Sequence, residues 1–389
     1  MKADYIIRGG RVMDPAAGTD EIRDLVIQNM RIVDPGAGHT ECPADRIIDA
    51  SGKIVTPGLI DFHTHLFYEG SSICIRPDMM IAQGTTAAVD AGSAGTCTYE
   101  AFSRSVIGQS LLRVKGFLTV YSGGQLDPRL CEDFNPALYN IEKMERVIEA
   151  NRDNLLGLKI RLSRGVVPDE TGAGYLKAAV SLAEDLNRRL GTNLRVCVHT
   201  TNSPVTAGEL ADCLRPGDIF CHCYQGAGNP ICLEDGTLDP KIAAARARGV
   251  LFDAANGKGN FGLQAARRAL AAGFEPDIIS SDLTIDKFNM PPYAKSLPLV
   301  ISKYLALGMD LMTILEKVTV NPARLMGLEH QIGTLAPGAF ADIAIFERKE
   351  KHYIQKDFCD DALECSEILV PQMTMIAGEI QYCQADFYL

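Results

Sequence analysis

The sequence lacks the features of a membrane protein or a disulfide-bonded protein. Its 389 residues contain no run of about 18 uncharged apolar residues. The first residues, MKADYIIRGGRVMDP, have no basic segment followed by an apolar stretch. The twelve cysteines lie scattered between Cys42 and Cys383 without a CxxC pair. We therefore expect a soluble, cytoplasmic protein without a membrane partner, whose cysteines are mostly reduced and buried.

The sequence also has little positive charge. Lysine and arginine number 38 against 49 acidic residues, so the formal net charge is −11. No dense Lys/Arg run interrupts this acidic average. An acidic surface repels a polyanion, and nucleic acid is therefore not expected as a partner. The expected partner is a small-molecule substrate, and the formation of a homo-oligomer stays open.

Apolar material for a large core is present, since 47% of the residues are hydrophobic. From Ile54 onward, short apolar runs alternate with longer segments of helical period, which indicates parallel strands covered by helices. Eight runs are expected to be strands: one ending at His65, then residues 86–90, 114–121, 156–162, 194–200, 218–223, 250–254 and 277–282. Helices are expected at residues 175–190, 260–272, 297–309 and 311–319.

Eight strands with intervening helices over about 250 residues predict an α/β fold, a closed (β/α)8 TIM barrel. An open doubly wound sheet is the alternative, but no glycine-rich dinucleotide loop follows an early strand. Before residue 50 and after Gly327 the sequence instead has short strands and turns, including a turn at Gly9-Gly10. We predict that residues 1–54 and 330–389 form a small β-sandwich domain beside a barrel of residues 55–329.

Histidine is scarce, and its distribution is informative. Only seven histidines occur, and four lie at or near the C-terminal ends of predicted barrel strands: His63, His65, His199 and His222. Barrels of this kind keep their active sites at that end. Residues two apart on a strand point the same way, so His63 and His65 can bind one metal ion while Phe62 faces the helices. Taken alone, the pair is equally compatible with two partly exposed histidines.

The fourth predicted strand carries two inward-pointing cations. The apolar side chains at even positions of residues 158–162 form a helix-facing side, which directs Lys159 and Arg161 into the barrel. Burial should lower the pKa of Lys159. A neutral amine can add carbon dioxide to give a carbamate, an anion able to bridge two cations. An ion pair of Lys159 with Asp61 or Asp90 is the alternative.

Three further strand ends add candidate ligands. His199 and His222 close two consecutive predicted strands, and Asp282 closes the last. Each alone could be a hydrogen-bonded structural residue or a helix cap. Together they offer nitrogen and oxygen ligands for zinc-like ions, with positions left for water. Cys221 and Cys223 flank His222, and strand alternation is expected to turn both toward the helices as packing residues.

In this order, the residues resemble the amidohydrolase superfamily, in the branch similar to dihydroorotases, hydantoinases and related deacetylases. The resemblance covers the whole chain and rests on residues 55–65, Lys159, His199, His222, Asp282, residues 321–323 and residues 333–343. It implies two divalent metal ions, with zinc expected. One ion would be held by His63, His65 and Asp282, and the second by His199 and His222. Carboxylated Lys159 and a hydroxide would bridge them.

The resemblance also implies a mechanism in which Asp282 takes a proton from the hydroxide and passes it to the leaving group. The substrate follows less directly. Dihydroorotases of this type usually have an arginine two residues after the second histidine, and that position is Phe67 here. Arg161 could instead bind a substrate carboxylate, and Tyr121 and Asn256 lie where substrate loops belong. Structural roles for these three residues are equally open.

The expected function is hydrolysis of an acyl ester or amide, such as deacetylation, of a small carboxylate-bearing molecule. A cyclic amidase of the dihydroorotase or hydantoinase kind is the alternative, because the same metal pair would serve it. A deaminase is less expected, since deaminases usually have a glutamate near the fifth strand, where residues 199–203 have none. A non-catalytic scaffold is remote, because every ligand position is filled.

Overall fold

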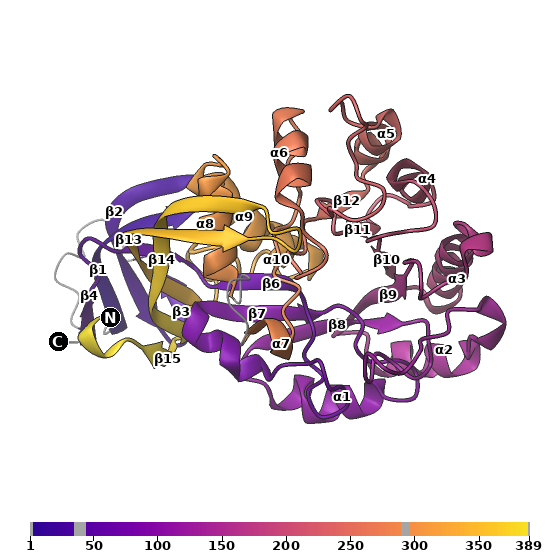
Figure 1. Cartoon of the computed structure of the whole chain (residues 1–389). Helices are drawn as coiled ribbons and strands as arrows, with labels where there is room; N and C mark the ends of the chain where they lie inside the picture. The colour runs from indigo at the N-terminus through magenta and orange to yellow at the C-terminus, as the bar shows by residue number, and fades with distance from the viewer. Residues whose placement is uncertain (1–2, 35–43, 289–295, 388–389) are drawn as a thin grey trace.

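The computed structural model describes residues 3–34, 44–288 and 296–387, which form two sheets and the helices around them (Figure 1). The first sheet is parallel, and its seven strands follow one another in chain order. These strands are β6 (Leu59–Thr64), β7 (Thr85–Asp90), β8 (Arg113–Thr119), β9 (Leu155–Arg161), β10 (Arg195–His199), β11 (Ile219–Cys221) and β12 (Leu251–Asp253). Parallel neighbours require crossover connections. Of the four predicted helices, the one at residues 175–190 makes such a connection, between β9 and β10.

The α-helices are α1 (Tyr99–Ser105), α2 (Ile141–Ala150), α3 (Gly174–Leu190), α4 (Ala207–Asp212), α5 (Pro240–Arg248), α6 (Leu263–Ala271), α7 (Ile285–Phe288), α8 (Leu297–Ala306), α9 (Leu311–Val318) and α10 (Val320–Leu325). Short 3-10 helices occupy Pro77–Gln83, Ile107–Gln109, Pro136–Leu138, Asp169–Thr171 and Ala385–Phe387. The four predicted helices are present as α3, α6, α8 and α9. In α3 the apolar side chains recur at helical spacing and are buried, and the helix ends at Gly191, whose φ is 63°.

The eighth predicted strand, residues 277–282, is not part of the regular ladder. Ile278 and Leu283 form isolated parallel bridges, with Asp253 of β12 and with Thr64 of β6. The segment therefore touches both edges of the curled parallel sheet without continuous pairing. Asp282, which lies between the two bridged residues, has a left-handed φ of 50°, outside the β region.

Both ends of the chain contribute to the second sheet. Its order is β15-β14-β13-β5-β1-β2-β3, and β4 pairs with β1. The strands are β1 (Ala3–Asp14), β2 (Thr19–Gln28), β3 (Arg31–Val33), β4 (Ala44–Asp49), β5 (Ile54–Pro57), β13 (Ile343–Lys356), β14 (Ala362–Ile376) and β15 (Glu379–Cys383). Among the described residues, the strands from the two ends of the chain thus form one mixed sheet, where a sandwich of two sheets was expected.

One local prediction at the N-terminal end, the turn at Gly9-Gly10, is wrong. Strand β1 continues through Gly9-Gly10 with a register shift, and Gly9 has a φ of 70°, so this pair makes a bulge rather than a turn. Strand β5 pairs with β13, with Ile345 opposite Val55. Residues 54–57 therefore belong to the mixed sheet, and the division of the chain into a β-domain and a barrel stays a prediction.

Two expectations about the whole chain can be compared with the described residues. None of their helices combines the length and the apolar character needed to cross a membrane. Their cysteines are free, and those at positions 74, 197, 221, 223, 232 and 365 are buried. Cys42 lies outside the described residues.

Candidate metal centre

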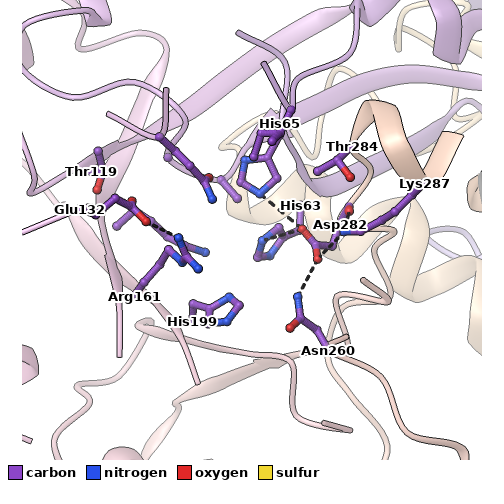
Figure 2. Close-up of a pocket in the computed structure, with 15 residues that line it drawn as sticks. His63, His65, Thr119, Glu132, Arg161, His199, Asn260, Asp282, Thr284 and Lys287 are labelled. Carbon is purple, nitrogen blue, oxygen red and sulfur yellow. Dashed lines mark hydrogen bonds and ion pairs between the residues drawn. The ribbon is translucent and has the colours of Figure 1, made fainter. Parts of the chain in front are cut away.

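A cavity of about 200 Å³ lies at the C-terminal ends of the parallel strands (Figure 2). Five of the predicted metal ligands line it: His63, His65, Lys159, His199 and Asp282. The sixth, His222, is fully buried, and its ring centroid is 4.3 Å from that of His199 and 5.1 Å from that of His63. The structure thus brings all six together from five separate segments.

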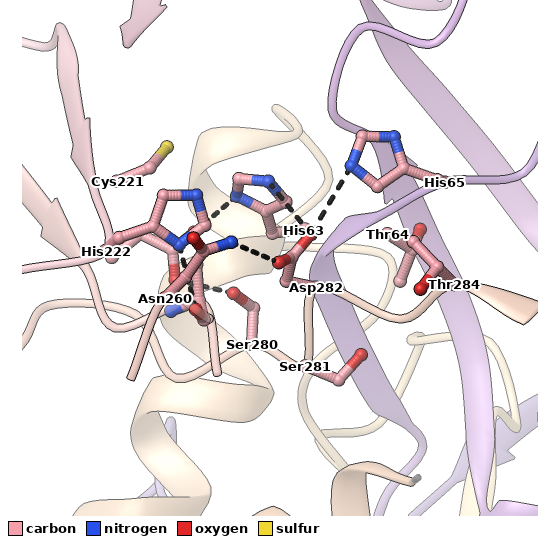
Figure 3. Close-up of polar contacts among 12 residues, drawn as sticks. His63, Thr64, His65, Cys221, His222, Asn260, Ser280, Ser281, Asp282 and Thr284 are labelled. Atoms are coloured by element: carbon pink, nitrogen blue, oxygen red, sulfur yellow. Dashed lines mark hydrogen bonds and ion pairs between the residues drawn. The ribbon is translucent and has the colours of Figure 1, made fainter. Parts of the chain in front are cut away.

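The first group consists of His63, His65 and Asp282. Their potential ligand atoms lie within 4.8 Å of one another, and all three residues are buried. Asp282 Oδ1 lies 3.3 Å from His65 Nε2 and 3.8 Å from His63 Nε2 (Figure 3). This spacing suits a single cation among two nitrogens and an oxygen.

A bulge in β6 makes this group possible. The register with β7 shifts between Asp61 and Thr64, so strict alternation does not hold across the HxH pair. Phe62 consequently packs against Phe117 on the inner face, with ring centroids 6.2 Å apart. The prediction that Phe62 faces the helices is wrong.

Hydrogen bonds to Nδ1 orient the histidine rings. His63 Nδ1 lies 3.0 Å from Asp253 Oδ2, and His65 Nδ1 lies 2.9 Å from Ser93 Oγ. Burial holds the pKa of His63 well below its usual range. Imidazoles held through Nδ1 can present Nε2 to a metal ion, which is the usual arrangement of histidine ligands.

The second group is His199 with His222. His222 Nδ1 donates to the Ala255 carbonyl at 2.9 Å, whereas its Nε2 is buried without a hydrogen-bond partner among the described residues. Burial lowers the pKa of His222 to about 3. A buried nitrogen lone pair without a partner is unfavourable in an empty protein and favourable beside a cation. The donor set therefore fits a second divalent ion.

The backbone at His222 overturns one expectation about its neighbours. His222 has a φ of 59°, which ends the alternation of β11. Cys221 therefore points to the inner face, where its Sγ lies 3.2 Å from that of Cys197. Cys223 packs in the larger apolar core, as predicted.

Lys159 is 3% exposed, and Arg161 lines the cavity two residues further on, as the alternation of β9 predicts. Lys159 Nζ lies 3.6 Å from Cys197 Sγ and 4.0 Å from Cys221 Sγ. Burial lowers the pKa of Lys159, but the charges of Cys197, Cys221 and Asp282 outweigh it and leave the pKa raised. The expected lowering is therefore not found.

The alternative partners proposed for Lys159 are engaged elsewhere. Asp61 accepts from Ser281 N at 3.0 Å, and Asp90 accepts from Ser93 N at 2.7 Å. Gly92 leaves the space that Lys159 needs, since a Cβ at Gly92 would lie 2.5 Å from Lys159 Cβ.

Asp282 has two partners that the sequence analysis did not identify. Lys287 Nζ lies 2.9 Å from Asp282 Oδ2, and Asn260 Nδ2 donates to the same oxygen at 2.9 Å. Burial raises the pKa of Asp282, but Lys287 and the histidines outweigh it and hold the pKa well below its usual range. Lys287 and Asn260 come from a four-residue helix and a loop, where no periodic pattern marks functional side chains.

The predicted substrate-binding residues are placed differently from one another. Arg161 lines the cavity and forms an ion pair with Glu132, which the sequence analysis missed. Tyr121 and Asn256 are not among the lining residues. Tyr121 packs edge-on against Phe134, and Asn256 donates to Ser280 O at 2.9 Å. Substrate contact by Tyr121 and Asn256 stays a prediction.

Comparisons with known proteins agree with this geometry. A sequence profile described as the amidohydrolase family matches residues 54–380. A deacetylase of Agrobacterium fabrum is 30% identical over 346 residues, covering 87% of this chain and 82% of that protein. The crystal structure of an adenine deaminase has a TM-score of 0.86 at 26% identity, covering 98% of this chain and 100% of that one. That of a dihydroorotase has a TM-score of 0.84 at 26% identity, covering 97% of each chain. The chain therefore belongs to the amidohydrolase family and is a hydrolase.

Proposed function

We propose that the protein is a deacetylase-type enzyme that uses two divalent metal ions to hydrolyse an acyl ester or amide of a small molecule. The observation that carries this proposal is the convergence of buried histidines and an ionised Asp282 on one cavity. The likeness to the Agrobacterium deacetylase supports an acyl bond as the target.

In this proposal His63, His65 and Asp282 hold one ion, and His199 and His222 hold the second. Imidazole and carboxylate ligands favour zinc. When bound, the ions polarise a carbonyl and lower the pKa of water. Their charge also disfavours the Lys159 ammonium, which makes the neutral amine available for carboxylation. The inner-face position of Lys159 supports a bridging role for its carbamate.

Asp282 is the proposed catalytic base and acid. Its Oδ2 accepts hydrogen bonds from Lys287 and Asn260, while its Oδ1 faces the two histidines. These contacts keep the carboxylate ionised and fix its direction. A proton taken up by Asp282 can then pass to the leaving group.

We further propose that residues 277–283 serve as the eighth strand of a closed barrel. The isolated bridges to β12 and to β6 support this. The hydrogen bond from Asp282 N to His63 O, 2.7 Å long, adds to them. Closure would hold Asp282 beside His63, as the first metal group requires.

A cyclic amidase is the second candidate, supported by the likeness to the dihydroorotase structure. Phe67 argues against it. Its side chain is 3% exposed and packs against Phe102, so this position offers no cation to a cyclic carboxylate substrate. A panel of N-acetyl and O-acetyl acids, hydantoins and dihydroorotate separates the two candidates, and faster turnover of dihydroorotate would favour the amidase.

Metal analysis tests the centre itself. Protein expressed with added zinc and bicarbonate should contain close to two ions per chain. Lys159→Ala should lose metal and activity, with partial rescue by short carboxylic acids, whereas Lys177→Ala on the exposed face of α3 should change neither. Full activity with only trace metal would refute the proposal.

A further inference from the structure

The cavity wall opposite Asp282 carries an ion pair, formed by Arg161 of β9 and Glu132 (Figure 2). Glu132 belongs to the segment between β8 and α2. Phe134, which is 1% exposed and packs against Tyr121, anchors that segment. The Glu132 side chain is 7% exposed and the Arg161 side chain 27%, so both are held in the wall rather than free in solvent.

The ion pair leaves hydrogen-bonding capacity directed at the cavity. The contact joins Arg161 Nη1 to Glu132 Oε2. Within residues 3–34, 44–288 and 296–387, neither side chain has another hydrogen bond, and both line the cavity. The remaining N–H groups of Arg161 and Oε1 of Glu132 are therefore available to a ligand.

An adjacent positive and negative charge complement a ligand that carries the opposite pair. A ligand with one charge competes with the pair for one partner, whereas a zwitterion gives each member an additional partner. The other charged pair of the cavity, Lys287 with Asp282, lies on the far side beside the histidines (Figure 2). The head of a substrate and its scissile bond would thus be bound at different walls.

We propose that Glu132 and Arg161 form a subsite for the zwitterionic head of a free α-amino acid whose side chain carries the acyl group. Arg161 binds the α-carboxylate and Glu132 binds the α-ammonium, which makes Glu132 a specificity-determining residue. This inference rests on the proposed acyl hydrolysis at the same cavity.

The dimensions restrict the side chain. Arg161 follows Lys159 by two residues on β9, which is roughly 7 Å along a strand. A cavity of about 200 Å³ admits only a small ligand. The substrate class is therefore an amino acid acylated on a short side-chain hydroxyl or amine. Hydrolysis consumes one water, breaks the acyl C–O or C–N bond, and releases a carboxylic acid and the free amino acid, the leaving atom taking a proton.

Four acetyl esters test the subsite with the metal-loaded enzyme. O-acetyl-L-serine has both charges, 3-acetoxypropionate lacks the ammonium, O-acetylethanolamine lacks the carboxylate, and ethyl acetate lacks both. The wild-type kcat/KM should be highest for O-acetyl-L-serine, by about 10- to 100-fold over each singly charged ester, as expected for one charged hydrogen bond.

Substitutions should divide these substrates. Glu132→Gln should lower kcat/KM about 10- to 100-fold for the two ammonium esters and should not lower it for 3-acetoxypropionate. Arg161→Gln should lower kcat/KM by about the same factor for the two carboxylate esters and should not lower it for O-acetylethanolamine. Glu142→Gln, an exposed glutamate of α2, is the matched control and should leave all four rates unchanged. Thermal unfolding checks that each variant is folded.

The failures are distinguishable. Equal losses for all four esters in folded Glu132→Gln, or no wild-type preference for the zwitterion, would overturn the subsite alone. Calorimetric binding of the product L-serine gives a readout that needs no turnover, and binding that is lost in Glu132→Gln supports the subsite. If serine binds in this way but no acetyl compound is hydrolysed, the proposed function fails and the subsite stands.

Discussion

Non-glycine residues with a positive φ have different roles in the two sheets. In the mixed sheet, non-glycine residues with positive φ lie in the turns that connect strands: Asn29 and Met30 between β2 and β3, Asp360 between β13 and β14, and Ala377 between β14 and β15. Beside the parallel sheet, they follow the C-terminal ends of strands or occupy the segment after β12: Asn202, His222, Ala255 and Asp282. A left-handed residue costs about 1–2 kcal/mol in either place.

The side chains of these residues explain the difference. Met30 is 55% exposed, so its conformation only reverses the chain. His222 and Asp282 are 0% and 4% exposed, and both belong to the candidate metal centre. Strained backbone beside the parallel sheet thus orients side chains of the candidate site. Strained backbone is commonly found at functional sites.

The two regions also differ in how deeply their charged side chains are buried. Asp282 is buried with an ammonium and two histidines nearby. In the mixed sheet the Arg11–Asp20 pair, for example, lies at the surface, with side chains 46% and 38% exposed. A charge change should therefore affect turnover at the first site and neither turnover nor folding strongly at the second.

The largest expected effect is that of Asp282→Asn. Removing the proton-transfer group should lower kcat roughly a hundredfold or more, while most of the metal stays bound. Steady-state kinetics and elemental analysis measure both quantities. Asp20→Asn in β2 is the matched control and should keep normal turnover. Near-normal turnover in Asp282→Asn would remove the catalytic role and the contrast between the regions.

The next effect concerns Lys303 of α8, which is 6% exposed and lies 3.2 Å from Asn256 Oδ1. Burial lowers the pKa of Lys303 from 10.5 to about 7, although Asp357 and Cys365 oppose the shift. Between those two pH values, the unfolded chain binds a proton that the folded protein does not. The free energy of unfolding should therefore rise with pH there, by up to about 1.4 kcal/mol per pH unit.

Lys303→Met should remove this contribution to the slope. Urea unfolding at pH 7, 8 and 9 measures the contribution as the free energy of unfolding of the wild type minus that of the variant. This difference should become more positive as the pH rises. Lys177→Met, on the exposed face of α3, is the control and should keep the wild-type slope. Parallel wild-type and Lys303→Met curves would mean that Lys303 remains charged in the folded protein.

The smallest effect is expected in the β2–β3 turn. Met30→Gly relieves the left-handed strain and creates the Asn-Gly pair favoured in two-residue hairpins, so the free energy of unfolding should rise by about 0.5–1 kcal/mol. Turnover should not change. Met30→Ala shortens the side chain but keeps the strain, and should not stabilise the protein. A lower free energy of unfolding in Met30→Gly would mean that the positive φ of Met30 does not destabilise the folded protein.

The sequence by itself determined the features that depend on local period. Alternation along β9 is sufficient to place Lys159 and Arg161 on the opposite face from their apolar neighbours, because a strand repeats every two residues. Helical period likewise located α3, α6, α8 and α9. The scarcity of histidine, with four at strand ends, was enough to indicate the candidate metal centre.

Only the tertiary structure decided where alternation stops and which distant groups meet. The bulge at Phe62 and the left-handed His222 break the period, and no local pattern marks either. Glu132 and Arg161 are 29 residues apart in the chain, and His63 and Asp253 are 190 apart. Such pairs depend on how loops and strands close around the cavity. Local periodicity carries no information about that closure, because it is set by contacts between distant segments.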